Sequence, residues 1–363
     1  MAKIIVKNLS KKYSSRQALK NVSFEIENGE LTVITGLKES GKTTLIRAIC
    51  GLDAVEKGEV FSDGVLINKM EPKDRNMALV AAYMPLNPNA SVAENVATGM
   101  KLRKFPKEEI ENKTAKALEI LGLSDYAKRV TKNLTPGQKY RLLFARAIAR
   151  EPKVVIVDDI FNGVEAGLRK ELRNEMVKLN KRLKINFIYV TNNPTDALIA
   201  ADKIAFLEEG ALTQYGTPAE LYDKPTTLGI ATFFGAPKIN LFQGVIEKEE
   251  GAYLLKTEGW SIKTDKTFAE DFDKKYVAAK KTVTLAVRAE DFYEDENGDI
   301  QVTVDSSDEW SGGKYLSVLY SGKIEEPTYF NAFIKTEEEK TLILSVKSDR
   351  LLIYDTETEV LIG

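Results

Sequence analysis

One stretch of the sequence decides the fold: Leu31-Thr32-Val33-Ile34-Thr35-Gly36-Leu37-Lys38-Glu39-Ser40-Gly41-Lys42-Thr43-Thr44-Leu45. A short run rich in β-branched residues ends at a glycine, and four residues follow. Gly41-Lys42-Thr43 then opens an amphipathic segment that predicts a helix over 44–50. The spacing of the two glycines and the lysine is that of a phosphate loop, which connects a strand to a helix. The stretch therefore predicts a nucleotide-binding α/β domain.

The chemistry of the predicted loop follows from its backbone and from two side chains. Loop N–H groups and the positive end of the following helix point to one place, which suits a di- or triphosphate. The ammonium of Lys42 adds a cation for the β- and γ-phosphates, and the hydroxyl of Thr43 can ligate Mg²⁺. A turn that merely contains Gly-Lys is the competing interpretation, which the strand before it and the helix after it disfavour. We expect the nucleotide to be bound by Gly36, Leu37, Lys38, Glu39, Ser40, Gly41, Lys42, Thr43 and Thr44.

Composition and charge narrow the class of protein. The chain of 363 residues is long enough for two domains. It has no apolar run that could span a bilayer, and its single cysteine, Cys50, fits a reducing cytosol. Residues 242–363 hold 15 Lys and Arg against 26 Asp and Glu, whereas residues 1–241 hold 37 against 28. The acidic C-terminal part argues against nucleic-acid binding, and the lack of histidine removes imidazole as a general base or metal ligand.

The first two thirds of the chain alternate between strand and helix patterns. Residues 154–159 form a continuous apolar run that ends in carboxylates, which is typical of a strand buried on both faces of a largely parallel sheet. Helical periodicity prevails over about 85–150, and a predicted helix over 165–183 precedes a predicted strand over 186–191. These patterns predict a layered α/β domain with a helical insertion.

The pattern changes at Gly235-Ala236-Pro237, after which the helical period disappears. Short strand patterns then alternate with Gly, Asp and Asn clusters, at 283–287, 300–304, 315–319, 329–334 and 341–346. We therefore expect a phosphate-loop domain over 1–235 and a small all-β, OB-like domain over 236–363.

Two further stretches bear on the predicted nucleotide site. Asp158, at the end of the predicted buried strand, is placed as the second Mg²⁺ partner of a phosphate loop. Between loop and strand lies Leu134-Thr135-Pro136-Gly137-Gln138, with Thr135 as a helix N-cap and Pro136 in the first turn. Alone, these five residues predict only the start of a helix. In this order with the loop and the strand, they resemble the signature loop of ABC-type ATPases, which reads Leu-Ser-Gly-Gly-Gln.

The resemblance then extends over nearly the whole chain. The sequence is similar to the ATP-binding subunits of carbohydrate ABC importers, of the maltose, trehalose and glycerol-phosphate type. Further matching stretches lie at 91–96, 201–204, 216–218, 234–240 and 287–290. The resemblance implies that Tyr13 stacks on adenine, that ATP and Mg²⁺ are the cofactors, and that the C-terminal domain is regulatory.

The resemblance also implies how the protein is assembled. Family members pair head to tail, so Leu134–Gln138 would contact the ATP held by a second subunit. The partners implied are membrane-spanning permease subunits, with the chain as a homodimer or as a heterodimer with a second ATP-binding subunit. The expected location is the cytoplasm, peripheral on the inner face of the cell membrane.

The departures from the family pattern fall on the reacting centre. The catalytic glutamate of the family is Asp159 here, one methylene shorter, and the switch histidine is Asn192. The glutamine that contacts Mg²⁺ aligns with Ala82, Pro136 removes a backbone N–H from the signature loop, and Glu39 replaces a loop glycine. The predicted catalytic residues are therefore Asp159, Asn192 and Lys42, and the predicted metal ligands are Thr43 and Asp158. The changes spare nucleotide binding and weaken hydrolysis, because a positioned base contributes about 10²–10⁴-fold.

Two functions remain open on the sequence alone. The chain could be the ATP-binding subunit that energises an importer of sugars or related solutes by ATP-driven dimerisation. It could instead be a catalytically weak pseudo-ATPase that serves as the regulatory half of a heterodimer. Phosphate release by the purified protein distinguishes the two, whereas the transported solute is not encoded in this chain.

Overall fold

The computed structural model describes residues 3–14, 16–81, 84–235, 237–249, 252–264, 266–310, 313–320, 328–334 and 341–363. The chain divides into two compact units, Met1–Pro218 and Ala219–Gly363. Within the described ranges, no helix combines the length and hydropathy needed to cross a bilayer.

The first unit is built on a six-stranded sheet in the order β10-β9-β3-β8-β7-β6. The central strand is β3 (Leu31–Gly36), whose six residues are all buried. It runs parallel to its two neighbours, and only β10 is antiparallel to the strand beside it. The other strands are β6 (Met77–Ala81), β7 (Val154–Asp158), β8 (Asn186–Val190), β9 (Lys203–Glu208) and β10 (Ala211–Gly216). The predicted parallel sheet is confirmed, and it places the ends of β3, β7 and β8 at one edge.

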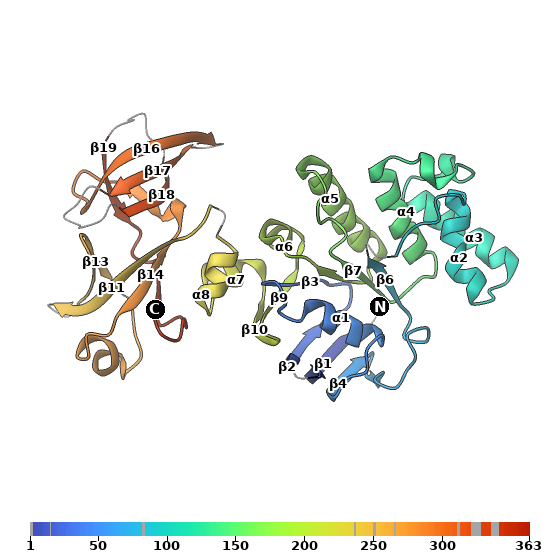
Figure 1. The fold of residues 1–363 in the computed structure, drawn as a ribbon, viewed down its shortest axis with the longest axis horizontal. Helices are drawn as coiled ribbons and strands as arrows, with labels where there is room; N and C mark the ends of the chain where they lie inside the picture. Colours follow the sequence, from blue (N-terminus) through green and yellow to red (C-terminus); the bar gives the residue numbers. More distant parts are fainter. Residues whose placement is uncertain are drawn as a thin grey trace. The chain divides into compact units, whose positions relative to one another are not determined.

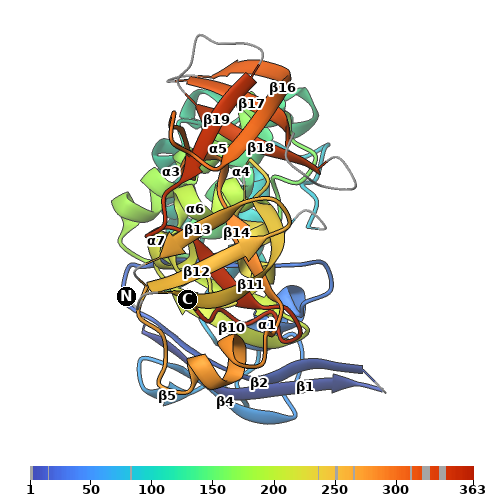
Figure 2. The same ribbon diagram turned by 90° about the vertical axis from the view of Figure 1, so that its left-hand side faces the viewer.

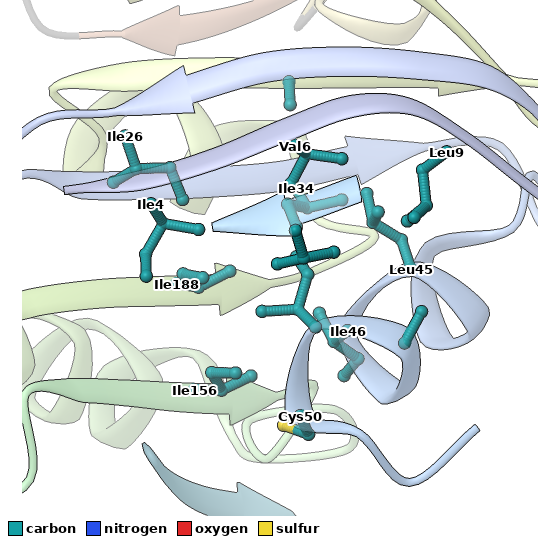
Figure 3. Close-up of a cluster of buried hydrophobic side chains, with 14 of the residues drawn as sticks. Ile4, Val6, Leu9, Ile26, Ile34, Leu45, Ile46, Cys50, Ile156 and Ile188 are labelled. Atoms are coloured by element: carbon teal, nitrogen blue, oxygen red, sulfur yellow. The ribbon is translucent and has the colours of Figure 1, made fainter. Parts of the chain in front are cut away.

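A second, antiparallel sheet packs against the same core in the order β2-β1-β4-β5. Its strands are β1 (Ile4–Tyr13), β2 (Arg16–Ile26), β4 (Lys57–Ser62) and β5 (Val65–Leu66). Helix α1 (Lys42–Cys50) lies between the two sheets, and Leu45 and Ile46 pack among aliphatic side chains from both (Figure 3). Burying α1 in this way fixes the direction of its N-terminus, where the phosphate loop ends.

The remaining helices of the first unit form two groups. Helices α5 (Ala166–Leu183) and α6 (Pro194–Ala200) lie on the opposite side of the six-stranded sheet from α1 (Figure 1). The predicted helical insertion consists of α2, α3 and α4 with two short 3₁₀ turns, at Val92–Leu102, Lys107–Ile120, Pro136–Ile148, Ser124–Tyr126 (η1) and Thr131–Asn133 (η2).

The second unit begins with two short helices, α7 (Pro218–Asp223) and α8 (Leu228–Phe233), and continues as two five-stranded antiparallel sheets (Figure 2). The first sheet contains β11 (Asn240–Glu249), β12 (Ala252–Thr257), β13 (Ser261–Thr264), β14 (Val283–Val287) and β20 (Leu352–Asp355). The second contains β15 (Phe292–Glu294), β16 (Ile300–Trp310), β17 (Gly313–Tyr320), β18 (Thr328–Ile334) and β19 (Thr341–Val346). Short turns of π and 3₁₀ type lie at Asp273–Val277 (η3) and Ala289–Asp291 (η4). The expected β-rich C-terminal domain is confirmed, with both sheets sharing one hydrophobic core.

The division between the units falls earlier in the chain than the boundary expected at 235. Ala231 of α8 is buried with Leu352 and Tyr354 of β20 in a small cluster of the second unit. The hydroxyl of Tyr354 donates to the backbone oxygen of Pro225 at 3.1 Å, and the backbone N–H of Leu228 donates to that of Glu359 at 2.9 Å. Residues 219–235 therefore pack with the β-rich unit, which the change of periodicity at 235 does not reveal.

Candidate functional site

The phosphate loop connects β3 to α1 through two glycines that no other residue could replace. Gly36, with a φ of 136°, ends the strand, and a Cβ there would lie 2.0 Å from the backbone oxygen of Leu207. Gly41, with a φ of 98°, is the N-cap of α1, and a Cβ there would lie 2.5 Å from the backbone oxygen of Ala18. The loop therefore packs tightly on its supporting strands, and α1 begins directly at Lys42.

The Lys42 ammonium is held inside the loop. Its Nζ donates to the backbone oxygens of Gly36 at 3.0 Å and Leu37 at 2.6 Å, and to the hydroxyl of Ser40 at 3.2 Å. Burial lowers the pKa of Lys42, and the nearby carboxylate of Asp159 opposes that shift. A cation in this position is prepared to exchange neutral carbonyl partners for phosphate oxygens.

A cleft of about 480 Å³ opens over the loop. It is lined by seven consecutive loop and helix residues and by four residues from other segments: Lys38, Glu39, Ser40, Gly41, Lys42, Thr43, Thr44, Tyr13, Arg16, Ala18 and Asn192. The structure therefore brings together the loop, Tyr13 and Asn192, as the sequence predicts. Gly36 and Leu37 form the floor of the loop through their contacts with Lys42.

Tyr13, the predicted adenine platform, is fixed by its hydroxyl. That group donates to Oδ2 of Asp53 at 2.6 Å, and the Asp53 carboxylate also accepts two hydrogen bonds from Arg47, at 2.8 and 3.0 Å. Tyr13 is 43% exposed, and the ammonium of Lys11 lies 5.1 Å from the centroid of its ring. An exposed ring whose orientation is set at its edge can stack on a flat base.

The ends of β7 and β8 place three polar side chains beside each other. Asp158 is the last residue of β7 and pairs with Val190 of β8. Asp159 follows in a left-handed conformation, with φ of 44°, and its N–H donates to the backbone oxygen of Val190 at 3.0 Å. Asn192 Nδ2 lies 3.5 Å from Oδ2 of Asp159, so the two residues at the predicted catalytic positions do face each other.

The electrostatic environment of these carboxyl groups is unfavourable to charge. Burial raises the pKa of Asp158, and the neighbouring Asp159 raises it further. Burial also raises the pKa of Asp159, against the opposing effects of Arg169 and Lys42. A divalent cation at the end of β7 would relieve both shifts, because it favours the ionised carboxylates.

The signature-like residues begin α4 and do not line the cleft. Thr135 is the N-cap: its hydroxyl accepts from the N–H of Gln138 at 3.3 Å, and Gln138 Oε1 accepts from the N–H of Thr135 at 3.0 Å. Pro136 occupies the first turn, and Leu134 is buried. Within this chain the segment therefore forms a well-capped helix start that leaves Thr135 and Pro136 exposed. Ala82, at the position of the family's glutamine, lies outside the described residues.

Sequence reasoning missed several residues that support the site. Arg16 lines the cleft from the tip of the β1–β2 hairpin. Behind the site, the buried carboxylate of Asp196 accepts hydrogen bonds from Arg169 at 2.8 Å, Arg173 at 3.1 Å and Tyr189 at 2.9 Å. None of these residues belongs to a local motif, because each reaches its partners only through the tertiary fold.

The residues present fit a magnesium nucleotide. The loop offers backbone N–H groups, the Lys42 ammonium and the N-terminus of α1 to a polyphosphate. For Mg²⁺, the hydroxyl of Thr43 and the carboxylate of Asp158 would be the protein ligands, with phosphate oxygens and water completing the shell. No cluster of three or more His, Cys, Asp or Glu that could hold a metal occurs among the described residues. Mg²⁺ that binds together with a nucleotide usually has only one or two protein ligands, so Thr43 and Asp158 would suffice.

Comparison with known proteins identifies the family. Residues 19–162 match the family described as ABC transporter. The sn-glycerol-3-phosphate import ATP-binding protein of Ruegeria pomeroyi is 34% identical, over 99% of this chain and 98% of the relative. The osmoprotective compounds uptake ATP-binding protein of a Synechocystis species is 35% identical, over 81% of this chain and 79% of the relative.

Solved structures agree with the sequence relatives. The ADP conformation of MJ1267, an ATP-binding cassette of an ABC transporter, superimposes with a TM-score of 0.57 and 25% identity, covering 62% of this chain and 96% of that chain. CbiO1 from Clostridium perfringens, part of an ABC transporter complex, gives a TM-score of 0.56 with 28% identity, over 60% of this chain and 89% of that chain. The resemblance inferred from the motifs is therefore confirmed: the chain belongs to the ABC transporter family and is one of its ATP-binding proteins.

Proposed function

We propose that this chain is the ATP-binding subunit that energises an importer of sugars or related solutes, such as glycerol phosphate or osmoprotectants. One observation carries the proposal: the phosphate-loop cleft, with Lys42 inside it, lies in a chain that matches an import ATP-binding protein over almost its full length. The names of the relatives favour an energising role over the purely regulatory half, which was the second interpretation of the sequence.

The site residues have the following roles in this proposal. Tyr13 stacks on adenine, the backbone and side chains of residues 36–44 bind the phosphates, and Thr43 and Asp158 hold Mg²⁺. Asp159 stands at the position of the general base, and Asn192 orients it through the contact at 3.5 Å. Because Asp159 is one methylene shorter than glutamate, we expect slow hydrolysis by the isolated chain.

The exposed start of α4 supports an assembly of two ATP-binding subunits. Thr135 and Gly137 would face the ATP held by the opposite subunit, in a homodimer or in a heterodimer with a second ATP-binding chain. Gln138 would have to release the N–H of Thr135 before it could reach a phosphate. ATP would therefore hold the two subunits together at the cytoplasmic face of the membrane.

A groove between α2 and α3 is our candidate surface for the membrane-spanning partner. It has a volume of about 650 Å³, and its floor is apolar, with Ala97, Phe105, Ile110 and Leu118. The buried Thr114 hydroxyl on its wall has no hydrogen-bond partner among the described residues. A short cytoplasmic segment of a permease subunit would supply both apolar contacts and a polar partner for this hydroxyl.

Equilibrium binding of a fluorescent ATP analogue tests the nucleotide site. Lys42→Ala removes the ammonium and should cost about 1.5–3 kcal/mol, which is roughly ten- to a hundredfold in Kd. Lys12→Ala is the matched control, because it removes an exposed cation that does not line the cleft. Unchanged affinity in Lys42→Ala would refute the site.

Binding to the permease tests the groove. Ala115 is exposed and lines the groove, so Ala115→Trp should fill it and prevent co-purification with the membrane-spanning partner subunits. Asn112→Trp places the same side chain on an exposed position of α3 outside the groove lining and should not interfere. ATP binding should be equal in both variants, and equal co-purification would contradict the docking surface.

A further inference from the structure

The phosphate loop of this chain contains one acidic residue, and an arginine holds it. Glu39 adopts a left-handed conformation with φ of 62°. Arg16, at the tip of the β1–β2 hairpin, donates through Nη2 to the backbone oxygen of Glu39 at 3.0 Å. Its Nη1 lies 2.9 Å from Oε2 of the Glu39 carboxylate. Both side chains line the nucleotide cleft, so this double contact belongs to the site and not to a distant surface.

The contact with Arg16 reduces the repulsion that the Glu39 carboxylate would exert on a bound polyphosphate. A carboxylate next to a bound polyphosphate repels it, and the repulsion grows with the number of phosphate charges. The guanidinium of Arg16 neutralises the carboxylate, and its second bond, to the Glu39 carbonyl, anchors the loop backbone at the same residue. The three hydrogen bonds of the Lys42 ammonium go to Gly36, Leu37 and Ser40 and not to Glu39, so Lys42 does not neutralise this carboxylate.

The same contact links the two halves of the site. The β1–β2 hairpin carries both Tyr13 and Arg16, which pair with each other across the turn. Tyr13 is tied through Asp53 to Arg47 of α1, and Arg16 is tied to the loop that precedes α1. The β1–β2 hairpin therefore connects the two parts of the site. One strand carries the residue that would stack on adenine, and the other carries the arginine that contacts the phosphate loop.

We propose that Arg16 is a positioning residue of the nucleotide site: it holds the Glu39 carboxylate aside and neutralises it, so that a polyphosphate can occupy the loop. The inference rests on the proposed nucleotide site. Arg16 acts through Glu39 and need not touch the nucleotide. Its main contribution, the neutralisation of the carboxylate, should therefore exist only while residue 39 carries a charge. The hydrogen bond to the backbone oxygen of residue 39 does not depend on that charge and should account for only a small remaining effect.

A double-mutant cycle measures this dependence by calorimetric titration of the full chain with ATP and with AMP. Arg16→Ala should raise the Kd for ATP about three- to fivefold, the upper range for an exposed ion pair, because the two side chains are 60% and 75% exposed. The same change should raise the Kd for AMP less, because AMP carries fewer phosphate charges. In the Glu39→Gln background, Arg16→Ala should change the Kd for ATP less than about twofold. Arg16→Lys, which keeps the charge, should restore most of the affinity, and Lys12→Ala is the charge-matched control on the same hairpin.

Each outcome decides the matter. An equal loss in the natural chain and in the Glu39→Gln background would mean that Arg16 binds the phosphates itself, and no loss in either would mean that the pair is irrelevant to binding. Either result overturns the inference. Lys42→Ala, titrated in parallel, distinguishes failure of this inference from failure of the proposed function. If Lys42→Ala binds ATP normally, the nucleotide site itself is wrongly assigned. If Lys42→Ala loses affinity and Arg16→Ala does not, the nucleotide site stands and only the role of Arg16 is refuted.

Discussion

At the scale of single residues, the site contains acidic side chains in backbone conformations that most residues avoid. Glu39 and Asp159 both have positive φ, at 62° and 44°, although neither is glycine. The sequence identified both as departures from the family pattern, because they stand at motif positions. It could not reveal Arg16 as the partner of Glu39, since that contact depends on how a hairpin folds over a loop.

The shortened base at position 159 leads to the first prediction. Asp159→Glu restores the missing methylene and should raise steady-state phosphate release at least about tenfold, a part of the 10²–10⁴-fold that a positioned base contributes. Asp159→Asn, which removes the base but keeps the size, should lower the residual rate. Rates that are equal in all three proteins, with Lys42→Ala as the blank, would show that residue 159 does not limit hydrolysis.

At the scale of elements, the sequence predicted those strands whose apolar run is flanked by turn-forming or charged residues. It did not predict strands whose own residues are charged. The patterns at 283–287 and 341–346 match β14 and β19, because Gly, Asp or Asn clusters or charged residues flank compact apolar runs. The strands β11 to β13 were not identified. β11 ends in the charged run Glu247-Lys248-Glu249, and side chains paired across the strands, such as Lys256 and Glu247, satisfy these charges only after folding.

Two buried aspartates in the second unit have opposite pKa shifts, and these give the second prediction. Burial raises the pKa of Asp291 to about 6, whereas hydrogen bonds, the first from Lys281, hold the pKa of Asp355 well below its usual range. Between about pH 4 and 6 the folded state therefore binds a proton at Asp291 that the unfolded state has already released. Above about pH 6 the carboxylate is charged and buried, and it then destabilises the fold by its full amount. Its effect on the free energy of unfolding becomes less unfavourable as the pH falls from 6 towards 4. Asp355 behaves in the opposite way: its stabilisation is complete above the unfolded pKa and is lost as the pH falls through the folded one.

Urea unfolding at pH 7.5 separates the two groups. Asp291→Asn should raise the free energy of unfolding by about 2–3 kcal/mol, and Asp355→Asn should lower it. Tryptophan fluorescence is the measurement, because both tryptophans of the chain, Trp260 and Trp310, belong to the second unit. Shifts of the same sign in the two variants would contradict the assignment.

At the scale of the whole molecule, the order of motifs predicted the fold class, but the change of hydrophobic period did not locate the division between the units. Helices α7 and α8 continue the helical pattern of the first unit, but α8 makes its contacts with the second. Leu221, Ile230 and Phe234 are fully buried, and α8 packs with β20. The sequence of a helix does not show on which distant strand the helix packs, so it does not show to which unit the helix belongs.

Truncation gives the third prediction. A chain ending at Pro218 and one ending at Phe234 should bind ATP with equal affinity, because both retain the loop and Tyr13. The longer one keeps α7 and α8 without the strands that cover them, so it exposes apolar side chains and should self-associate. Size-exclusion chromatography with light scattering distinguishes the two. A monomeric 1–234 fragment together with an aggregated 1–218 fragment would place the boundary at 235 after all.

The buried position of Cys50 makes the protein convenient for spectroscopy. Cys50 is the last residue of α1, and its side chain lies in the core (Figure 3). It is 6% exposed, and burial raises its pKa to about 12. At neutral pH almost none of this thiol is ionised, so maleimide dyes should leave it unmodified. The natural chain is thus effectively free of reactive thiols. Cysteines introduced at Lys12 and Tyr293, exposed positions in different units, would carry a donor and an acceptor dye whose energy transfer follows the two units during nucleotide binding.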